Sequence, residues 1–206
     1  LLCFILLAKT VAPAQNISVT IGSPATIPPD YFGYNGANLN RPGQPSFDTP
    51  WLIDSIASLY PLALRYPAGL LSNYWDWQRG YLKKDLPDGW VLPDNYSSLT
   101  KSNSLSQFRT MLNRNALAPV MALNVLCSNK EYETAELFAA NGLNIPVKYL
   151  DFGSELYHDY KNYYEVFPTA ESYTFKANEW AAYMKNIPGM SNLKIGIVGA
   201  TNRNEP

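Results

Sequence analysis

One carboxylic acid in the sequence stands where an enzyme could use it. Glu155 follows the apolar segment Val147–Gly153 by two residues, and the aromatic residues Phe152 and Tyr157 lie close to it in the chain. A carboxyl group among aromatic rings tends to keep its proton, because burial disfavours the charged form. Such a group can donate a proton to a departing oxygen and later accept one from water. We therefore predict that Glu155 is a general acid and base; the alternative is that it begins a loop or caps a helix.

A second set of candidate residues follows the apolar segment Leu62–Tyr66. Arg65 lies near the end of this segment, where its planar cation could orient carboxylates or bind sugar hydroxyl groups. The loop that follows combines flat aromatic rings with amide and carboxylate groups, which together suit the faces and hydroxyl groups of a sugar ring. Its predicted substrate-binding residues are Asn73, Trp75, Asp76 and Trp77. For each ring, the alternative is that it fills the core of the fold.

Further candidate residues stand at the ends of other apolar segments. Asn35 and Asn124 each follow such a segment, so their amides could bind sugar hydroxyl groups or could stabilise turns. Ser154 and Tyr157 flank Glu155 and complete the set of predicted substrate-binding residues. His158 follows Glu155 by three residues and could face the site, although we expect it to be a solvated loop residue.

The segments that would position these residues alternate between strand and helix. Strand candidates are residues 31–35, 62–66, 118–124, 147–153 and 194–198, and helix candidates are residues 51–59, 104–115, 130–141 and 172–185, the last with Ser172 as N-cap. Strand followed by helix, repeated along the chain, indicates a parallel β/α architecture. A (β/α)₈ barrel usually takes about 250 residues, so five units in this chain indicate the first part of a TIM barrel. A doubly wound sheet is the alternative, but the phosphate-binding pattern G-x-G-x-x-G does not follow the first strand.

The beginning of the chain is expected to lie outside the barrel. The apolar run Leu1–Ala8 is too short to span a membrane, and an A-x-A-like stretch follows it. This pattern indicates an incomplete secretory signal peptide over residues 1–15, with a buried strand as the alternative. Residues 16–29 are expected to form a strand and a turn, and residues 30–206 the truncated barrel. We therefore expect a secreted protein, extracellular or periplasmic, that does not stay in the membrane after signal cleavage.

The composition argues against several classes of partner and site. The chain has 16 Lys and Arg residues against 17 Asp and Glu residues, so its net charge of −1 disfavours binding to nucleic acid or anionic membranes. Cys127 is the one cysteine outside the expected signal peptide and His158 is the one histidine, so the usual ligands of zinc are scarce. We expect no metal and no other cofactor, and the sequence does not indicate an oligomeric state.

Three motifs in the chain resemble one group of enzymes. They are residues 35–38 (NGAN), residues 65–77 (RYPAG…NYWDW) and residues 153–155 (GSE). In this order they resemble the catalytic barrel of clan A retaining glycoside hydrolases, especially the α-L-arabinofuranosidases and the heparanase-like family 79 β-glucuronidases. The likeness covers roughly residues 30–206.

This resemblance implies a function and two catalytic carboxyl groups, one as acid/base residue and one as nucleophile. The function is hydrolysis of O-glycosidic bonds in an oligosaccharide or polysaccharide, without a cofactor. Glu155 matches the acid/base residue that ends the fourth strand of the barrel in this clan. The clan's nucleophile is a glutamate at the end of the seventh strand, which would lie beyond residue 206, so the 206-residue piece alone is expected to be inactive.

Two positions depart from the pattern of the clan. Ser154 stands where the clan has Asn, whose amide would bind the 2-hydroxyl group of the sugar. Ala68 stands where Gly is common, a change that matters if the backbone φ angle is positive there. These departures leave open an alternative function, that of a secreted carbohydrate-binding or otherwise non-hydrolytic relative of the same fold.

Overall fold

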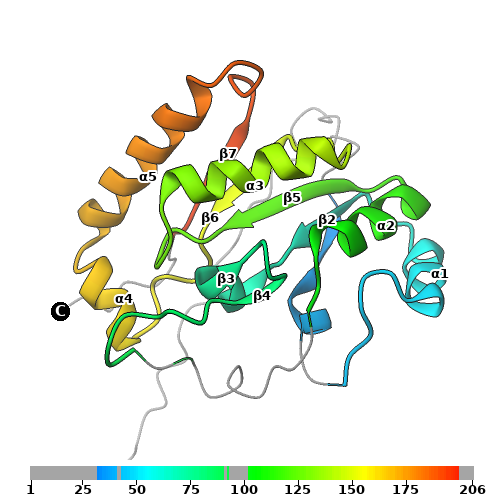
Figure 1. The fold of residues 1–206 in the computed structure, drawn as a ribbon, viewed down its shortest axis with the longest axis horizontal. Coiled ribbons are helices and arrows are strands. Elements are labelled where there is room, and N and C mark those ends of the chain that lie inside the picture. The colour runs from blue at the N-terminus through cyan, green and yellow to red at the C-terminus, as the bar shows by residue number, and fades with distance from the viewer. Residues whose placement is uncertain (1–31, 41–42, 91, 93–101, 200–206) are drawn as a thin grey trace, which may run out of the picture.

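The computed structural model describes residues 32–40, 43–90, 92 and 102–199 (Figure 1). The expected signal peptide at residues 1–15 and the expected strand and turn at residues 16–29 lie outside the described residues. Within the described part of the chain, no helix is long and apolar enough to cross a lipid bilayer.

Five parallel strands form one sheet, in the same order as they occur in the chain (Figure 1). They are β1 (Gly33–Asn35), β2 (Ala63–Tyr66), β5 (Ala118–Leu123), β6 (Tyr149–Phe152) and β7 (Lys194–Ile197). Each pairs in parallel with the next, and each lies within a segment that the sequence predicted as a strand. A doubly wound sheet reverses its strand order at a switch point. The sequential order seen here is instead the one expected of a barrel segment.

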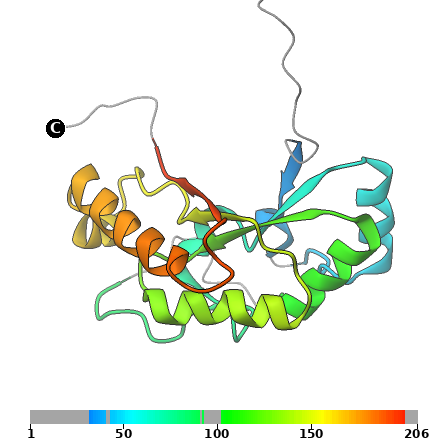
Figure 2. The ribbon, with the colours of Figure 1, turned by 90° about the horizontal axis from the view of Figure 1, so that it is seen from above.

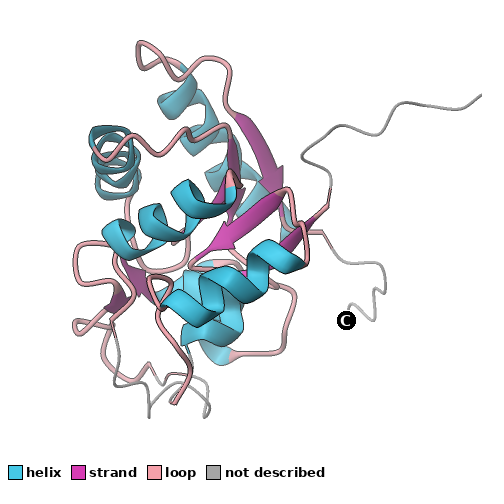
Figure 3. Ribbon diagram, turned by 90° about the vertical axis from the view of Figure 1, so that its right-hand side faces the viewer, coloured by secondary structure: helices cyan, strands magenta, loops and turns pink. Residues whose placement is uncertain are grey.

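The helices lie between successive strands and cover one side of the sheet. They are α1 (Pro50–Ser58), α2 (Leu105–Asn115), α3 (Lys130–Gly142), α4 (Lys161–Val166) and α5 (Ala170–Lys185). Figure 2 shows α1, α2, α3 and α5 along the same side of the strands, and Figure 3 shows this layering from another direction. The sequence predicted these four helices. It did not predict α4, because six residues are too few for a recognisable apolar period.

Reciprocal hydrogen bonds fix where α5 begins. Its N-cap is Thr169, whose hydroxyl oxygen accepts a hydrogen bond from the backbone N–H of Ser172 at 3.2 Å. The Ser172 hydroxyl oxygen accepts one in turn from the backbone N–H of Thr169 at 3.3 Å. The prediction of Ser172 as N-cap is therefore wrong by three residues, since Ser172 occupies the third helical position of a capping box.

The two faces of the sheet differ in character, because side chains alternate along each strand. The face toward the helices is apolar and almost fully buried; it carries Leu64, Tyr66, Met121, Leu123, Leu150 and Phe152. The opposite face carries Arg65 and Asp151, whose side chains are 20% and 32% exposed. In a closed barrel this second face would line the interior.

The chain between β2 and α2 contains short elements that the sequence did not predict. A 3₁₀ helix, η2 (Gly69–Tyr74), leads into a two-stranded antiparallel hairpin of β3 (Trp75–Asp76) and β4 (Tyr81–Leu82). Another 3₁₀ helix, η1 (Gly36–Asn40), follows β1. These elements begin at the carboxyl ends of β1 and β2, the end of a parallel β/α barrel where functional loops gather.

Candidate active site

Two charged side chains meet on the open face of the sheet. The Nε of Arg65 on β2 donates a hydrogen bond to Oδ2 of Asp151 on β6, over a distance of 2.6 Å. This contact passes over β5, which lies between the two strands. On β7, Gly196 makes room for the carboxylate, since a Cβ atom at that position would lie 2.5 Å from Oδ1 of Asp151. The sequence analysis predicted Arg65 as a site residue but missed Asp151.

Arg65 also contacts the turn that leads to Glu155. Its Nη2 donates to the carbonyl oxygen of Gly153 at 3.2 Å, and its Nη1 donates to the hydroxyl oxygen of Ser154 at 3.4 Å. Because its Nε also donates to Asp151, all three nitrogens of the guanidinium group form hydrogen bonds with β6 or with the turn after it. Arg65 therefore ties the carboxyl end of β2 to that of β6.

Asn73 clamps the same turn from the opposite loop. Its side chain accepts a hydrogen bond from the backbone N–H of Ser154 at 2.9 Å and donates to the backbone carbonyl oxygen of Ser154 at 2.7 Å. It also donates to the hydroxyl oxygen of Tyr163 at 2.8 Å. Asn73 is fully buried. It therefore positions the turn, and the prediction that it binds substrate is not met, because its hydrogen-bonding groups face the protein.

The backbone of this turn has an unusual shape that aims Glu155 outward. Gly153 has φ +78°, and a Cβ atom there would lie 2.8 Å from Cδ1 of Leu156. Glu155 itself has φ +50°, a left-handed conformation that is uncommon for residues with a side chain. Residues in such conformations are found preferentially at functional sites.

The carboxyl group of Glu155 is more open to solvent than the sequence predicted. Its side chain is 47% exposed, and one carboxyl oxygen lies 3.1 Å from Nε2 of His158. Phe152 does not shield it, because that ring points toward the helices, packs against Trp180 and is fully buried. The predicted wall of aromatic rings is thus wrong for Phe152, whereas Tyr157, 52% exposed, remains near Glu155 in the chain.

The two tryptophans predicted as stacking surfaces for a sugar instead contact other parts of the protein. Trp75 is 3% exposed; its ring stands edge-on against Tyr66 at 5.9 Å, and its indole N–H donates to the hydroxyl oxygen of Tyr66 at 3.3 Å. Trp77 is half-buried and donates its indole N–H to the carbonyl oxygen of Tyr132 at 3.1 Å. The core alternative therefore holds for Trp75, and Trp77 joins the hairpin to α3.

Asp76 and Asn124 also bind protein groups rather than facing an open site. A carboxylate oxygen of Asp76 accepts a hydrogen bond from the Tyr132 hydroxyl at 2.6 Å. The amide of Asn124 donates to the carbonyl oxygen of Trp75 at 3.0 Å and accepts from the backbone N–H of Cys127 at 3.0 Å. Asn124 is 1% exposed. The turn-stabilising alternative is the one that the structure supports for Asn124.

Asn35 differs from these buried residues because it lies open at the end of β1. The residue is exposed, and its side-chain oxygen accepts a hydrogen bond from the backbone N–H of Ala37 at 3.3 Å. Its amide nitrogen is thus placed at the carboxyl edge of the sheet. Of the predicted site residues, the structure brings Arg65, Asn73 and Ser154 together, with Glu155 next in the chain.

Two buried carboxyl groups lie behind this edge, and the sequence analysis did not single them out. Glu133 and Glu136 on α3 are 2% and 1% exposed. One carboxyl oxygen of Glu133 accepts a hydrogen bond from the backbone N–H of Asn124 at 2.9 Å. Burial raises the pKa of Glu133 to about 7 and raises that of Glu136 well above its usual range. The sequence did contain a sign that these two glutamates share one face of α3. They are three residues apart, and Leu137 lies on the same face.

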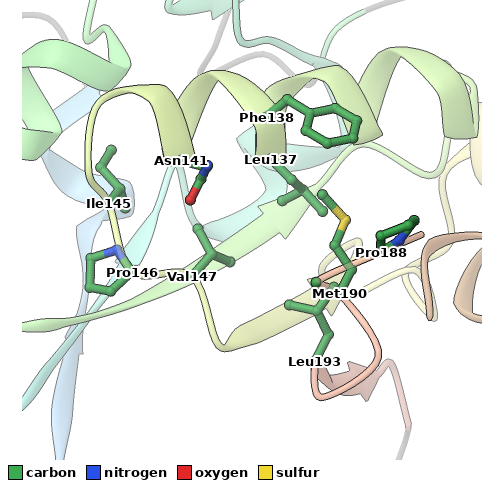
Figure 4. Close-up of a pocket in the computed structure, with 10 residues that line it drawn as sticks. Leu137, Phe138, Asn141, Ile145, Pro146, Val147, Pro188, Met190 and Leu193 are labelled. Atoms are coloured by element: carbon green, nitrogen blue, oxygen red, sulfur yellow. The ribbon is translucent and has the colours of Figure 1, made fainter. Parts of the chain in front are cut away.

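A cavity of about 230 Å³ lies at the other end of the sheet and contains none of the predicted site residues (Figure 4). Apolar side chains of α3 and of the segments before β6 and β7 line it, among them Leu137, Val147, Met190 and Leu193. Because these segments lead into the amino ends of the strands, this cavity is remote from the carboxyl edge that carries Glu155.

The described residues contain no group of three or more His, Cys, Asp or Glu side chains that could hold a metal ion. At the carboxyl edge the structure places the exposed carboxyl group of Glu155, the Arg65–Asp151 ion pair and the surrounding amides and hydroxyls.

Comparison with known proteins relates this fold to one group of hydrolases. No family model matches the chain, and no curated protein matches its sequence. Solved structures do match. A family 51 α-L-arabinofuranosidase from Bifidobacterium longum superposes with a TM-score of 0.59 at 16% identity, over 87% of this chain and 40% of that one. The α-L-arabinofuranosidase of Thermotoga maritima, in complex with arabinose, gives a TM-score of 0.56 at 16% identity, over 83% of this chain and 39% of that one.

The fold is similar to part of theirs. A third structure, the thermostable family 51 α-L-arabinofuranosidase of Thermotoga petrophila, gives a TM-score of 0.54 at 16% identity. The chain spans about two-fifths of the length of these glycoside hydrolases. The similarity supports the predicted resemblance to clan A at the level of the fold, and the resemblance to the family 79 branch stays a prediction.

Proposed function

We propose that this chain supplies the first five β/α units of a retaining glycoside hydrolase, with Glu155 as the acid/base residue. One observation carries the proposal. Arg65, Asp151 and Asn73 fix the turn from Gly153 to Glu155 at the carboxyl end of β6. β6 is the fourth strand of the sheet, which is the strand that bears the acid/base residue in the clan that the sequence resembles.

The proposed reaction proceeds in two steps. In the first, a carboxylate attacks the anomeric carbon, the bond to the leaving oxygen breaks, and Glu155 gives its proton to that oxygen. In the second, Glu155 takes a proton from water, whose oxygen displaces the carboxylate and releases the sugar with its original anomeric configuration. Proton transfer by a positioned group of this kind typically contributes about 10²- to 10⁴-fold in rate.

The nucleophile and the missing strands are part of the same proposal. β1 and β7 each have one edge without a neighbouring strand among the described residues, and Tyr34 and Ile197 on them are 47% and 63% exposed. We propose that three further β/α units cover these edges in the complete protein and bring the nucleophilic carboxylate. Secretion is a further proposal and rests on the apolar run at residues 1–8.

The remaining predicted residues have distinct proposed roles. Arg65, paired with Asp151, holds the turn that carries Glu155. Asn35 offers its exposed amide to the sugar that is cleaved, and Tyr157 offers an exposed ring beside Glu155. Ser154 is 5% exposed and holds the turn through its bonds to Arg65 and Asn73. Because the similar structures are α-L-arabinofuranosidases by name, we propose an α-L-arabinofuranoside as the first substrate to test.

Hydrolysis of an arabino-oligosaccharide by the complete protein tests this proposal. The Glu155→Gln variant is expected to lose about 10²- to 10⁴-fold in kcat, because Gln cannot donate the proton. Glu131→Gln is the matched control: Glu131 is an exposed glutamate on α3 and not part of the turn, and its variant should keep wild-type turnover. Equal turnover of the Glu155→Gln variant and the wild type would contradict the assignment.

A second candidate function is carbohydrate binding without hydrolysis. Ser154 favours it, because its hydroxyl is short, 5% exposed and engaged with Arg65 at 3.4 Å. A contact to the 2-hydroxyl group would then be missing from the transition state. Calorimetry with an oligosaccharide, combined with analysis of products, separates the two functions, since binding without any product supports the second.

A further inference from the structure

The apolar cavity at the amino end of the sheet takes no part in the proposed reaction. Its volume is about 230 Å³, and it lies between α3 and the segments that lead into β6 and β7 (Figure 4). An engineered apolar cavity of about 150 Å³ in another protein stays dry and binds benzene. The volume of this cavity therefore suits one aromatic ring with a small substituent.

Hydrogen bonds of the backbone fix the two segments that border the cavity opposite α3. Before β6, the N–H of Ile145 donates to the carbonyl oxygen of Ala140 on α3 at 2.9 Å. At the start of β7, the N–H of Lys194 donates to the carbonyl oxygen of Lys148 at 2.9 Å and so joins the second segment to the first. The shape of the cavity therefore does not depend on a free loop.

Part of the lining belongs to the hydrophobic core. Leu137, Ile145 and Leu193 are only 3%, 2% and 9% exposed. Side chains so closely packed on their other sides have little freedom to move inward and fill the space. The cavity is therefore a preformed hollow in the core, open at a rim that includes the exposed residues Pro146 and Pro188.

The position of the cavity in the sheet keeps it apart from the edges that further units would join. Its border is formed by α3 and by the segments before β6 and β7, which pair with each other. The strand edges without a neighbour among the described residues are one edge of β1 and the edge of β7 that faces away from β6. Additional β/α units at those two edges would leave the cavity between α3 and the two segments as it is.

The lining favours an uncharged aromatic ligand with one polar group. None of the ten described residues around the cavity is charged, and an unpaired ion is costly to remove from water. Met190 contributes a thioether, which makes favourable contacts with aromatic rings. Asn141 has the one polar side chain among the ten, and in Figure 4 it points from α3 toward Val147. Its amide oxygen can accept a hydrogen bond from a hydroxyl group.

We propose that this cavity binds a small uncharged phenol, with the ring among Leu137, Val147 and Met190 and the hydroxyl group on the amide of Asn141. It is a second binding site, separate from the carboxyl edge of the sheet that carries Glu155. The inference does not rest on the proposed function, because none of the lining residues takes part in the proposed reaction.

Titration of the complete protein with phenol and with toluene, followed by ligand-observed NMR, tests the site and its polar contact. The two molecules have nearly the same shape, but only phenol has a hydroxyl group. We expect both to bind, and Asn141→Ala to weaken the binding of phenol by about 3- to 10-fold while that of toluene stays unchanged. Asn178→Ala is the matched control, since Asn178 is an exposed residue of α5 outside the lining, and should change neither affinity.

A second variant fills the cavity. Val147 is half-buried, and Val147→Phe should place a ring in the space and weaken the binding of both molecules by at least about 10-fold. Thermal unfolding shows whether this variant is folded, and the exposed Asn141→Ala variant tests the site in either case. Absence of binding to the wild-type protein would mean that another part of the complete chain fills the cavity, and it would overturn the inference. Equal affinities of the two asparagine variants for phenol, or unchanged binding by folded Val147→Phe, would place the ligand elsewhere and also overturn it.

Discussion

Asn73 joins the two halves of the candidate site through hydrogen bonds to both backbone groups of Ser154 and to Tyr163. We expect Asn73→Ala to lower the free energy of unfolding by about 2–3 kcal/mol, because it leaves the buried N–H and C=O of Ser154 without partners. Thermal unfolding measures the change. Asn113→Ala, at an exposed position of α2, is the control and should have almost no effect. Similar melting temperatures for the two variants would show that the hydrogen bonds between Asn73 and Ser154 contribute little to stability.

The buried glutamates of α3 make a prediction about pH. The pKa of Glu133 is about 7 in the folded chain against about 4.5 when it is exposed, so the unfolded chain loses this proton at lower pH than the folded chain does. The titration of Glu133 should therefore lower the free energy of unfolding as pH rises from about 4.5 to 7, by on the order of 3 kcal/mol, and Glu136, whose pKa is also raised, acts in the same direction.

The Glu133→Gln variant removes this titration and keeps an oxygen that can accept the hydrogen bond from the N–H of Asn124. We expect it to be about 2–3 kcal/mol more stable than the wild type at pH 8 and similar to it at pH 4. Denaturant unfolding at the two pH values provides the measurement, and the exposed neighbour Glu131→Gln serves as the control. A variant that is less stable than the wild type at pH 8 would mean that a nearby cation neutralises the buried charge.

Among the elements, η2 is preceded by a residue in a conformation that suits glycine. Its N-cap, Ala68, has φ +72° and ψ 159° and is fully buried. This region of backbone conformation is almost confined to glycine and costs other residues about 1–3 kcal/mol. Ala68, which stands where the resembling enzymes commonly have Gly, therefore strains the backbone of the loop that carries Asn73.

Ala68→Gly should relieve this strain and raise the melting temperature by a few degrees, since about 1 kcal/mol corresponds to roughly 2–4 °C in a chain of this size. Ala182→Gly, at an exposed position in the last turn of α5, is the opposite control and should lower the stability, by up to about 0.5–1 kcal/mol. Differential scanning calorimetry of both variants is sufficient. A lower melting temperature for both would show that Ala68 is not strained.

The elements also show which parts of the site a sequence can predict. The strands of the sheet and the four longer helices follow from apolar periodicity, and with them the place of Arg65 and Glu155 at strand ends. The partners of the side chains do not follow from it. Trp75 and Asn124 have the residue types of a sugar-binding site, yet they bind Tyr66 and Cys127 and are buried in the fold. Asp151 was missed because its partner, Arg65, is 86 residues away.

At the scale of the whole molecule, β1 and β7 each have one edge without a neighbouring strand among the described residues, and a closed barrel in the complete protein would cover both edges. Hydrogen–deuterium exchange tests this. The amides of β1 and β7 should exchange rapidly in the 206-residue chain and slowly in the complete protein, whereas the central strand β5 should be protected in both. Rapid exchange at β1 and β7 in the complete protein would argue against a closed barrel.

The most direct test of the central claim is chemical rescue of Glu155→Ala in the complete protein. If Glu155 is the acid/base residue, the variant hydrolyses 4-nitrophenyl α-L-arabinofuranoside slowly, because this leaving group departs without protonation but water is no longer activated; added azide then takes the place of that water and restores turnover. We expect a glycosyl azide with the same anomeric configuration as the substrate. Unchanged turnover without azide, or a glycosyl azide of inverted configuration, would contradict it.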